Sequence, residues 1–239
     1  MEILAIIPAR AGSKGLPNKN ILPLNGQPLL SYSIAAGIQT PEIKRVICST
    51  DSQNIADIAK NFGAEVPFLR PTKYAQDMSQ DIDLFEHALK WLKDNNSYVP
   101  DLVINLRPTS PIRYIKDIQK AISLINSDEK IDSVRSISTP PTTPYKMWKK
   151  KSSILIEPLL KINDNPEPFN SPRQALPIIW AQTGSIEVIR ERTISNLHSM
   201  SGNNIAGLEV SEDTYIDIDT INSMQLAEVV LSKLDCIKP

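Results

Sequence analysis

The sequence contains few of the residues that several common kinds of protein chemistry require. Its two cysteines, Cys48 and Cys236, cannot supply a disulfide framework and form no C-x-x-C pair, which favours a reducing cytoplasm. Its two histidines, His87 and His198, form neither an H-x-x-H nor an H-E-x-x-H motif. A serine elbow and a G-x-G-x-x-G motif are also missing, so the sequence disfavours nucleophilic serine catalysis and dinucleotide chemistry.

Long apolar runs and an excess of charge of one sign are lacking as well. No apolar run approaches the ~20 residues that span a bilayer, and the N-terminus has no signal-peptide pattern, so we expect no membrane association. The net charge is −1, which provides no global attraction to nucleic acid. The 239 residues, 41% of them hydrophobic, are enough for one large domain with a buried core, with or without an appendage.

Runs typical of strands alternate with runs typical of helices through most of the chain. The strand-like runs are residues 3–7, 45–49, 65–69, 101–106, 133–137, 185–189 and 208–210. The helix-like runs are residues 28–38, 53–62, 81–95, 115–127 and 221–234. Apolar strands that alternate with helices predict an α/β fold with a doubly wound, mostly parallel sheet. Ligands bind such sheets beyond the carboxyl ends of the strands.

The alternation stops in a stretch that is rich in proline. Within it, residues 153–160 alternate as a small hairpin would. We therefore expect a main domain of residues 1–138 and 178–239, and an arm formed by residues 139–177. Because an arm that leaves a sheet usually packs against something, a second copy of the chain is an expected partner, although plain surface charge would explain the arm's cations equally well.

The loop after the first strand combines two glycines with three cations. Arg10, Lys14 and Lys19 lie within ten residues of one another, interspersed with Gly12 and Gly15. Glycine lets the backbone approach a ligand closely, and exposed N–H groups with full positive charges form an anion cradle. This pattern favours a nucleoside triphosphate over the alternative, a basic surface loop without a ligand.

Polar residues that follow later strands are further candidates. Arg70 can clamp a phosphate or form a surface ion pair, and residues 107–113 can be a ligand-binding turn or only a rigid loop. Asp217 and Asp219 are two residues apart, which places both carboxylates on one face of an extended segment. Two such carboxylates suit Mg²⁺ that is also bound by phosphate oxygens, although a helix cap is the alternative.

Five motifs occur in a fixed order along the chain. They are I-P-A-R-A-G-S-K-G-L-P-N-K-N at residues 7–20, R-P at 70–71, R-P-T-S-P at 107–111, P-R-Q-x-L-P at 172–177 and D-I-D at 217–219. This series resembles the acylneuraminate cytidylyltransferases, the CMP-sialic acid synthetases, over essentially the whole chain. The resemblance implies a Rossmann-like nucleotidyltransferase fold with a small dimerisation arm, and a cytoplasmic homodimer that uses Mg²⁺. It also implies that CTP and an acidic nine-carbon 2-keto sugar react to give a CMP-sugar and pyrophosphate.

The resemblance further assigns roles to individual residues. The implied catalytic residues are Arg10, Lys14, Lys19 and Asp219. The implied nucleotide-binding residues are Ala9, Arg10, Gly12, Ser13, Lys14, Asn20, Arg70, Asp81 and Arg107. The implied sugar-binding residues are Thr109, Ser110, Lys146, Arg173, Gln174, Gln182 and Thr183, of which Lys146 and Arg173 would reach the neighbouring subunit's site. The implied metal ligands are Asp217 and Asp219.

Four positions and one segment depart from the pattern of the sialic acid enzymes, and the segment, D-M-S-Q-D at residues 77–81, stands where those enzymes have a Ser-rich stretch that faces the nucleotide. Arg107 stands where those enzymes usually have Gln, and Ala181, Thr183 and Glu187 stand where Arg, Asn and Tyr are common. The last three of these positions fall in the expected sugar pocket, so they predict a sugar other than N-acetylneuraminate, such as legionaminic acid or another nonulosonate. The alternatives are transfer to octulosonate, guanylyl transfer by the same fold, and a non-catalytic protein that binds nucleotide sugars.

Overall fold

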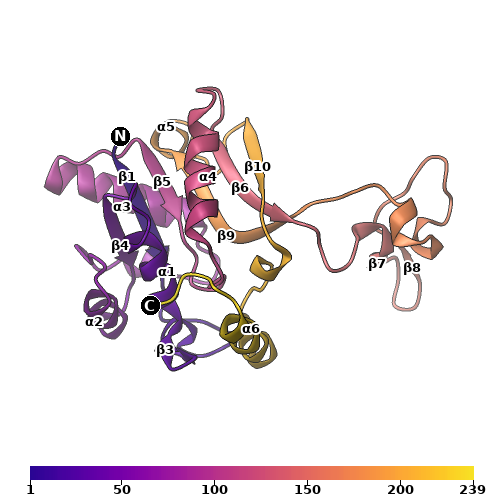
Figure 1. Cartoon of the computed structure of the whole chain (residues 1–239), viewed down its shortest axis with the longest axis horizontal. Helices are drawn as coiled ribbons and strands as arrows, with labels where there is room; N and C mark the ends of the chain where they lie inside the picture. The colour runs from indigo at the N-terminus through magenta and orange to yellow at the C-terminus, as the bar shows by residue number, and fades with distance from the viewer. The chain divides into compact units, whose positions relative to one another are not determined.

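The computed structural model describes residues 1–239, which form two compact units (Figure 1). The larger one, here called the core unit, comprises Met1–Ile137 and Gln182–Pro239. The smaller one, the arm unit, comprises Ser138–Ala181. The predicted boundaries, which place the arm at residues 139–177, lie within a few residues of these.

A six-stranded sheet forms the centre of the core unit, with the strand order β10-β6-β9-β5-β1-β4. The strands are β1 (Ile3–Pro8), β4 (Arg45–Ser49), β5 (Leu102–Asn105), β6 (Ser133–Ser138), β9 (Ala181–Arg190) and β10 (Ile205–Glu209). β1 pairs in parallel with both β4 and β5, and β10 pairs in parallel with β6. Only the β5–β9 pair is antiparallel among these described pairs. The predicted α/β fold with a mostly parallel sheet is confirmed.

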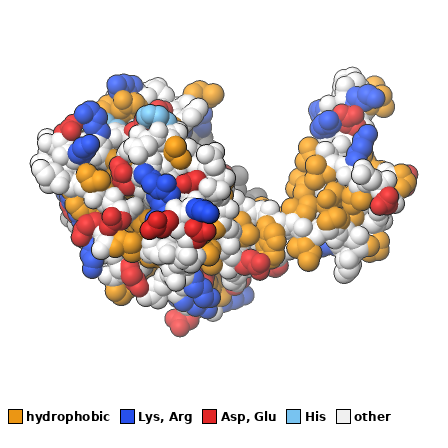
Figure 2. Space-filling view, turned by 90° about the horizontal axis from the view of Figure 1, so that it is seen from above, with side chains coloured by type: hydrophobic (Ala, Val, Ile, Leu, Met, Phe, Trp, Pro, Cys, Tyr) orange, Lys and Arg blue, Asp and Glu red, His pale blue; other side chains and the backbone are white.

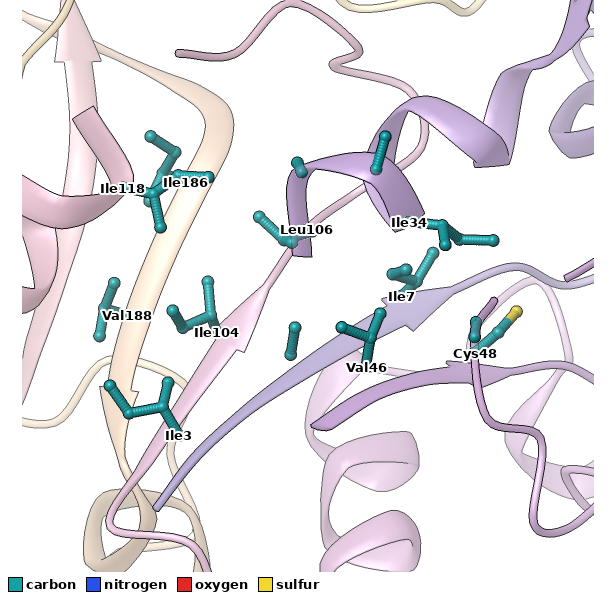
Figure 3. Packing of buried hydrophobic residues seen from close by; sticks show 14 of the residues in the cluster. Ile3, Ile7, Ile34, Val46, Cys48, Ile104, Leu106, Ile118, Ile186 and Val188 are labelled. Atoms are coloured by element: carbon teal, nitrogen blue, oxygen red, sulfur yellow. The ribbon is translucent and has the colours of Figure 1, made fainter. Parts of the chain in front are cut away.

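Helices cover both faces of this sheet (Figure 1). They are α1 (Leu29–Ile38), α2 (Gln53–Asn61), α3 (Asp81–Asn96), α4 (Ile115–Asn126), α5 (Glu191–Ser195) and α6 (Ile221–Lys233). Side chains of β1 alternate between the two faces, as the pleat requires. Ile3 and Ile7 pack in the cluster that includes α1, α2 and α4, which Figure 3 shows from close by. Leu4 and Ile6 pack on the opposite face with α3 and α5.

A third apolar cluster lies under α6 and fixes the segment that contains the two aspartates. Ile218 is fully buried in this cluster, and its N–H donates a 2.8 Å hydrogen bond to the carbonyl oxygen of Thr109. The cluster also contains Leu24, from a short ribbon of β2 (Pro23–Leu24) and β3 (Gln27–Pro28). This ribbon was not predicted, although the Asn25-Gly26 pair at its turn is a strong hairpin signal, and both residues have positive φ.

Three predictions about strands and helices were incomplete or wrong. Residues 65–69 do not form a strand, because only a single bridge joins Glu65 to Ile47 and Pro67 has no N–H to donate. The predicted strand at 185–189 is the second half of a longer one, β9. The short helix α5 was missed, since five residues are too few to show a helical period.

The arm unit contains a small antiparallel hairpin of β7 (Trp148–Lys150) and β8 (Ile156–Pro158). Several large apolar side chains of this unit are exposed, led by Ile154 at 88% and Ile178 at 80%. Figure 2 shows hydrophobic side chains gathered over part of this unit. In neither unit does a helix combine the length and apolar character needed to cross a membrane.

Candidate active site

A pocket of about 370 Å³, here called the main pocket, is lined by residues that follow β1 and β5 and by the start of α3. Its position agrees with the expectation that ligands bind beyond the carboxyl ends of the strands. The predicted site residues that line it are Arg10, Ser13, Lys14, Lys19, Asn20, Arg70, Asp81, Arg107, Thr109 and Asp219. Ala9, which is fully buried, and Gly12 are not among the lining residues.

Two of the predicted cations meet on one carboxylate that was not predicted. Arg10 Nη1 lies 2.9 Å from one oxygen of Asp77, and Lys14 Nζ lies 2.6 Å from the other. Hydrogen bonds from Lys14 and Arg10 hold the pKa of Asp77 below its usual value. Asp77 therefore lies between two cations, at a position that would suit an anionic group of a ligand. The resemblance places the segment 77–81 beside the nucleotide, but it assigned no role to Asp77.

The third cation is held from the far end of the chain. Lys19 Nζ lies 2.6 Å from Asp219 Oδ1. Close to this pair, the loop passes so near the backbone of Asp219 that a Cβ atom on Gly15 would lie 2.7 Å from that residue's carbonyl oxygen. Real Cβ atoms essentially never come that close to a backbone oxygen, so only glycine permits the approach.

Part of the backbone of the loop forms hydrogen bonds within the protein. The N–H of Ala9 donates to the carbonyl of Ser49 at 3.0 Å, and the N–H of Ala11 donates to Asp51 Oδ1 at 2.9 Å. The N–H of Ser13 donates to the carbonyl of Ala11 at 2.9 Å. These three amides hold the loop in place. The N–H groups of Gly12, Lys14 and Gly15 donate to no other group within residues 1–239, so the anion cradle stays a prediction that rests on them.

Two predicted nucleotide-binding residues are buried and support the walls of the main pocket. Arg70, only 4% exposed, donates from Nε to Ser49 Oγ at 3.1 Å and from Nη1 to the carbonyl of Tyr74 at 3.4 Å. Burial lowers the pKa of this guanidinium. Asn20 Nδ2 donates to the carbonyl of Arg10 at 2.9 Å, which ties the two ends of the loop together.

A second pocket of about 340 Å³, here called the side pocket, shares Arg107 and Thr109 with the main pocket. Its other lining residues are Ser110, Gln182, Thr183, Gly184, Tyr215 and Asp217. All predicted sugar-binding residues of the core unit thus line one pocket, although Ser110 and Thr183 are largely buried. The remaining ones, Lys146, Arg173 and Gln174, belong to the arm unit, and their approach to the pocket stays a prediction.

Arg113 holds the turn between β5 and α4 in place. The residue is fully buried and faces no carboxylate, and burial lowers the pKa of its guanidinium to about 9. It donates to the carbonyls of Ser185 at 2.5 Å and Arg107 at 2.6 Å, and to Ser33 Oγ at 3.0 Å. Arg113 closes the R-P-T-S-P-I-R stretch, and its contacts give it a structural role there.

The predicted metal ligands line different pockets, Asp219 the main pocket and Asp217 the side pocket. Ile218 between them points into the core, which leaves both carboxylates on the outer face. No cluster of three or more His, Cys, Asp or Glu side chains that could hold a metal is present in residues 1–239. Two carboxylates are a donor set that suits Mg²⁺ when phosphate oxygens and water complete the coordination.

The fold of the chain is that of known nucleotidyltransferases. A solved structure of CMP:2-keto-3-deoxy-manno-octonic acid synthetase in complex with CTP matches with a TM-score of 0.71 at 16% sequence identity. The match covers 98% of this chain and 99% of the other. At this identity the likeness concerns the fold, and it confirms the predicted Rossmann-like architecture.

Sequence comparison identifies the family. The pattern of the family described as "Cytidylyltransferase" matches residues 4–195, and the chain belongs to this family. N-acylneuraminate cytidylyltransferase of Escherichia coli is 41% identical over 137 residues, which are 57% of this chain and 31% of that protein. CMP-N,N'-diacetyllegionaminic acid synthase of Legionella pneumophila is 40% identical over 143 residues, 59% of this chain and 61% of that protein. The match spans less than two thirds of the length of either relative.

Proposed function

We propose that this protein is a cytidylyltransferase that transfers CMP from CTP to the 2-hydroxyl of an acidic 2-keto sugar, a nonulosonate, and releases pyrophosphate. One observation carries the proposal: Arg10, Lys14 and Lys19 come from a single loop and line the same pocket as Asp219. Three cations beside a carboxylate fit a triphosphate with its metal ion. Membership of the cytidylyltransferase family supports CTP as the nucleotide.

The proposed reaction is a single in-line displacement. The 2-hydroxyl oxygen of the sugar forms a bond to the α-phosphorus, the bond from that phosphorus to the bridging oxygen breaks, and pyrophosphate leaves with the electron pair. The hydroxyl proton passes to solvent. The protein contributes position and charge, because Arg10, Lys14 and Lys19 hold the phosphates and neutralise the negative charge that grows on them.

Asp219 and Asp217 would hold the Mg²⁺ ion of this enzyme. When bound, Mg²⁺ neutralises phosphate charge and makes a coordinated hydroxyl more acidic. Lys19, which pairs with Asp219, ties this carboxylate to the phosphate-binding loop. The side pocket would receive the acceptor sugar, because it adjoins the main pocket at Arg107 and Thr109.

We also propose that the protein works as a cytoplasmic homodimer joined by the arm unit. The exposed apolar side chains of this unit, including Ile154 and Ile178, support a surface that is covered by another chain. In such a dimer, Lys146 and Arg173 would approach the acceptor in the partner's site. The use of CTP agrees with a cytoplasmic location.

The proposed activity is tested by measuring pyrophosphate release with Mg²⁺ and each nucleoside triphosphate. The acceptors are N-acetylneuraminate, diacetyllegionaminate, pseudaminate and 3-deoxy-octulosonate. We expect release only with CTP and a nonulosonate. Release with 3-deoxy-octulosonate as the only active acceptor would favour transfer to octulosonate. Release with GTP as the only active nucleotide would favour guanylyl transfer. Tight CTP binding without release, with every acceptor, would favour a non-catalytic binding protein.

A further inference from the structure

A fully buried carboxylate lies behind the two pockets. Glu187 occupies the middle of β9, is 0% exposed, and faces Asn105 directly across the antiparallel β5–β9 pair. Its Oε2 accepts a 2.8 Å hydrogen bond from Asn105 Nδ2, and its Oε1 accepts a 2.7 Å hydrogen bond from Gln182 Nε2. A carboxylate that is this deeply buried needs a cation to offset its lost hydration.

Arg135 of β6 is the close cationic partner of Glu187. Its Nη1 lies 2.5 Å from Glu187 Oε1, and its side chain is only 11% exposed. The other end of the same guanidinium donates to the carbonyl of Met200 at 2.6 Å and to Ser201 Oγ at 2.8 Å. These contacts fix Arg135, and Arg135 in turn fixes the position of the Glu187 carboxylate.

Arg107, which lines both pockets, also contacts Glu187. Its Nη2 lies 3.4 Å from Glu187 Oε1 and 2.5 Å from Asp81 Oδ2, at the start of α3. The guanidinium thus contacts two carboxylates, one from β9 and one from α3. Desolvation works against its charge, but Glu187 and Asp81 outweigh that effect and keep the pKa of Arg107 above its usual value.

The position of Arg107 matters because of what else lines the side pocket. Arg107 is the only cation among that pocket's lining residues, which otherwise carry hydroxyls, an amide and the carboxylate of Asp217. The triphosphate, by contrast, already has Arg10, Lys14 and Lys19 in the main pocket. An acceptor with a carboxylate would therefore meet Arg107 as its cation in the core unit.

We propose that Arg107 recognises the carboxylate of the acceptor sugar, and that Glu187 is the positioning residue that holds Arg107 at the border of the two pockets. This inference rests on the proposed function. It assigns to the acceptor a residue that the sequence alone placed with the nucleotide. It also makes one coupled unit of Arg107 and Glu187, two of the positions that depart from the sialic acid pattern.

The mechanism of positioning is electrostatic. Without the negative charge of Glu187, the closest carboxylate to the guanidinium of Arg107 would be Asp81, which draws it toward the start of α3, and the more distant Asp217 would be the only carboxylate of the side pocket that attracts it. Gln182 also donates to Glu187, but an amide in place of this carboxylate keeps an oxygen that accepts that bond, so Glu187→Gln would affect acceptor binding through Arg107. If Glu187 had only a structural role, its substitution would instead change the KM for CTP and the KM for the sugar by similar factors, whether or not Arg107 is present.

The test compares Arg107→Gln, Glu187→Gln and the double variant in steady-state kinetics, with the KM for the acidic sugar and the KM for CTP measured separately. Loss of a charged hydrogen bond predicts a rise in the sugar KM of about 10- to 100-fold in Arg107→Gln. The KM for CTP should change less than about threefold. Glu187→Gln should raise the sugar KM by a smaller factor than Arg107→Gln does. The sugar KM of the double variant should exceed that of Arg107→Gln by less than about twofold.

Glu65→Gln is the matched control, because it breaks an ion pair with Arg45 outside both pockets. It should leave both KM values unchanged, and thermal unfolding verifies that all variants are folded. Arg107 is partly exposed, so its variant tests the proposal even if Glu187→Gln does not fold.

The outcomes separate this inference from the proposed function. Suppose that the wild-type protein is active and that Arg107→Gln raises the KM for CTP but not the KM for the sugar. This result would overturn the inference and leave the proposed function intact. The same holds if Glu187→Gln raises the sugar KM equally with and without Arg107. A wild-type protein that is inactive with every acidic sugar would overturn the proposed function and, with it, this inference.

Discussion

The ammonium group of Lys19 lies 2.6 Å from the carboxylate of Asp219, although 200 residues separate the two in the chain. The contact joins the loop after β1 to the segment before α6. It brings the predicted phosphate-binding loop and the predicted metal-binding segment to one side of the main pocket. Both were recognisable in the sequence, but nothing in the sequence shows that they touch.

The first prediction concerns this carboxylate. In Asp219→Ala, the rate of pyrophosphate release should fall by about 100-fold or more, because both the metal ligand and the partner of Lys19 are lost. Asp57→Asn, on the outer side of α2, is the control and should retain the wild-type rate. Chelation of divalent ions with EDTA should abolish wild-type release. An Asp219→Ala variant with most of its turnover would contradict the metal assignment.

A second prediction follows from the close approach at Gly15. In Gly15→Ala, the added Cβ would meet the carbonyl of Asp219 at 2.7 Å, so the loop and this segment must separate. We expect CTP affinity, measured by calorimetry, to fall by about tenfold. Gly12→Ala should be much milder, since a Cβ there meets nothing within 4 Å. Equal losses in the two variants would show that loop flexibility, and not the approach to Asp219, is what matters.

The third prediction concerns Asp77, which pairs with Arg10 and Lys14 where we expect phosphate to bind. Because CTP must displace this carboxylate, Asp77→Asn should bind CTP about two- to fivefold more tightly at low salt, a gain that matches the small value of exposed ion pairs. The gain should shrink as salt rises. Tripolyphosphate should show the same gain, whereas cytidine should not. Weaker binding of CTP to the variant would mean that Asp77 itself helps to hold the nucleotide.

Asp132 supplies a prediction about pH. Hydrogen bonds from the backbone N–H groups of Asn204 and Asn203 hold the pKa of its carboxyl below the usual 3.8. A depressed folded-state pKa adds stability that is present above the unfolded-state pKa and is lost as the pH falls through the folded-state value. Asp132→Asn should therefore lower the Tm at pH 7, and the difference should narrow below about pH 4. A difference that stays constant from pH 7 to pH 3 would contradict this account.

The proposed dimer predicts complementation between two inactive variants. One variant, Lys146→Ala, is changed in the arm unit only. The other variant, Asp219→Ala, is changed in the core unit only. If the arm of one copy completes the site of the other, each mixed dimer has one intact site, and co-expression should restore about one quarter of wild-type activity. Activity no higher than the sum of the separate variants, or a monomer by light scattering, would contradict the proposed arrangement.

The sequence by itself determined the framework of this protein. Short continuous apolar runs such as residues 3–7 are typical of buried strands, and the apolar spacing of a helix is also local, so the strands of the sheet and most helices could be predicted. The cations at Arg10, Lys14 and Lys19 and the aspartate pair were visible for the same reason. They lie within short segments whose residue types and spacing predict a triphosphate and a metal ion as ligands.

Only the tertiary structure decided which of these groups meet. Asp77 between Arg10 and Lys14, and Glu187 beneath Arg107, join residues that lie 63 or more positions apart in the chain. Only the tertiary structure also places Asp219 in the main pocket and Asp217 in the side pocket. Long-range contacts of this kind follow from how the elements pack, and residue spacing carries no record of that packing.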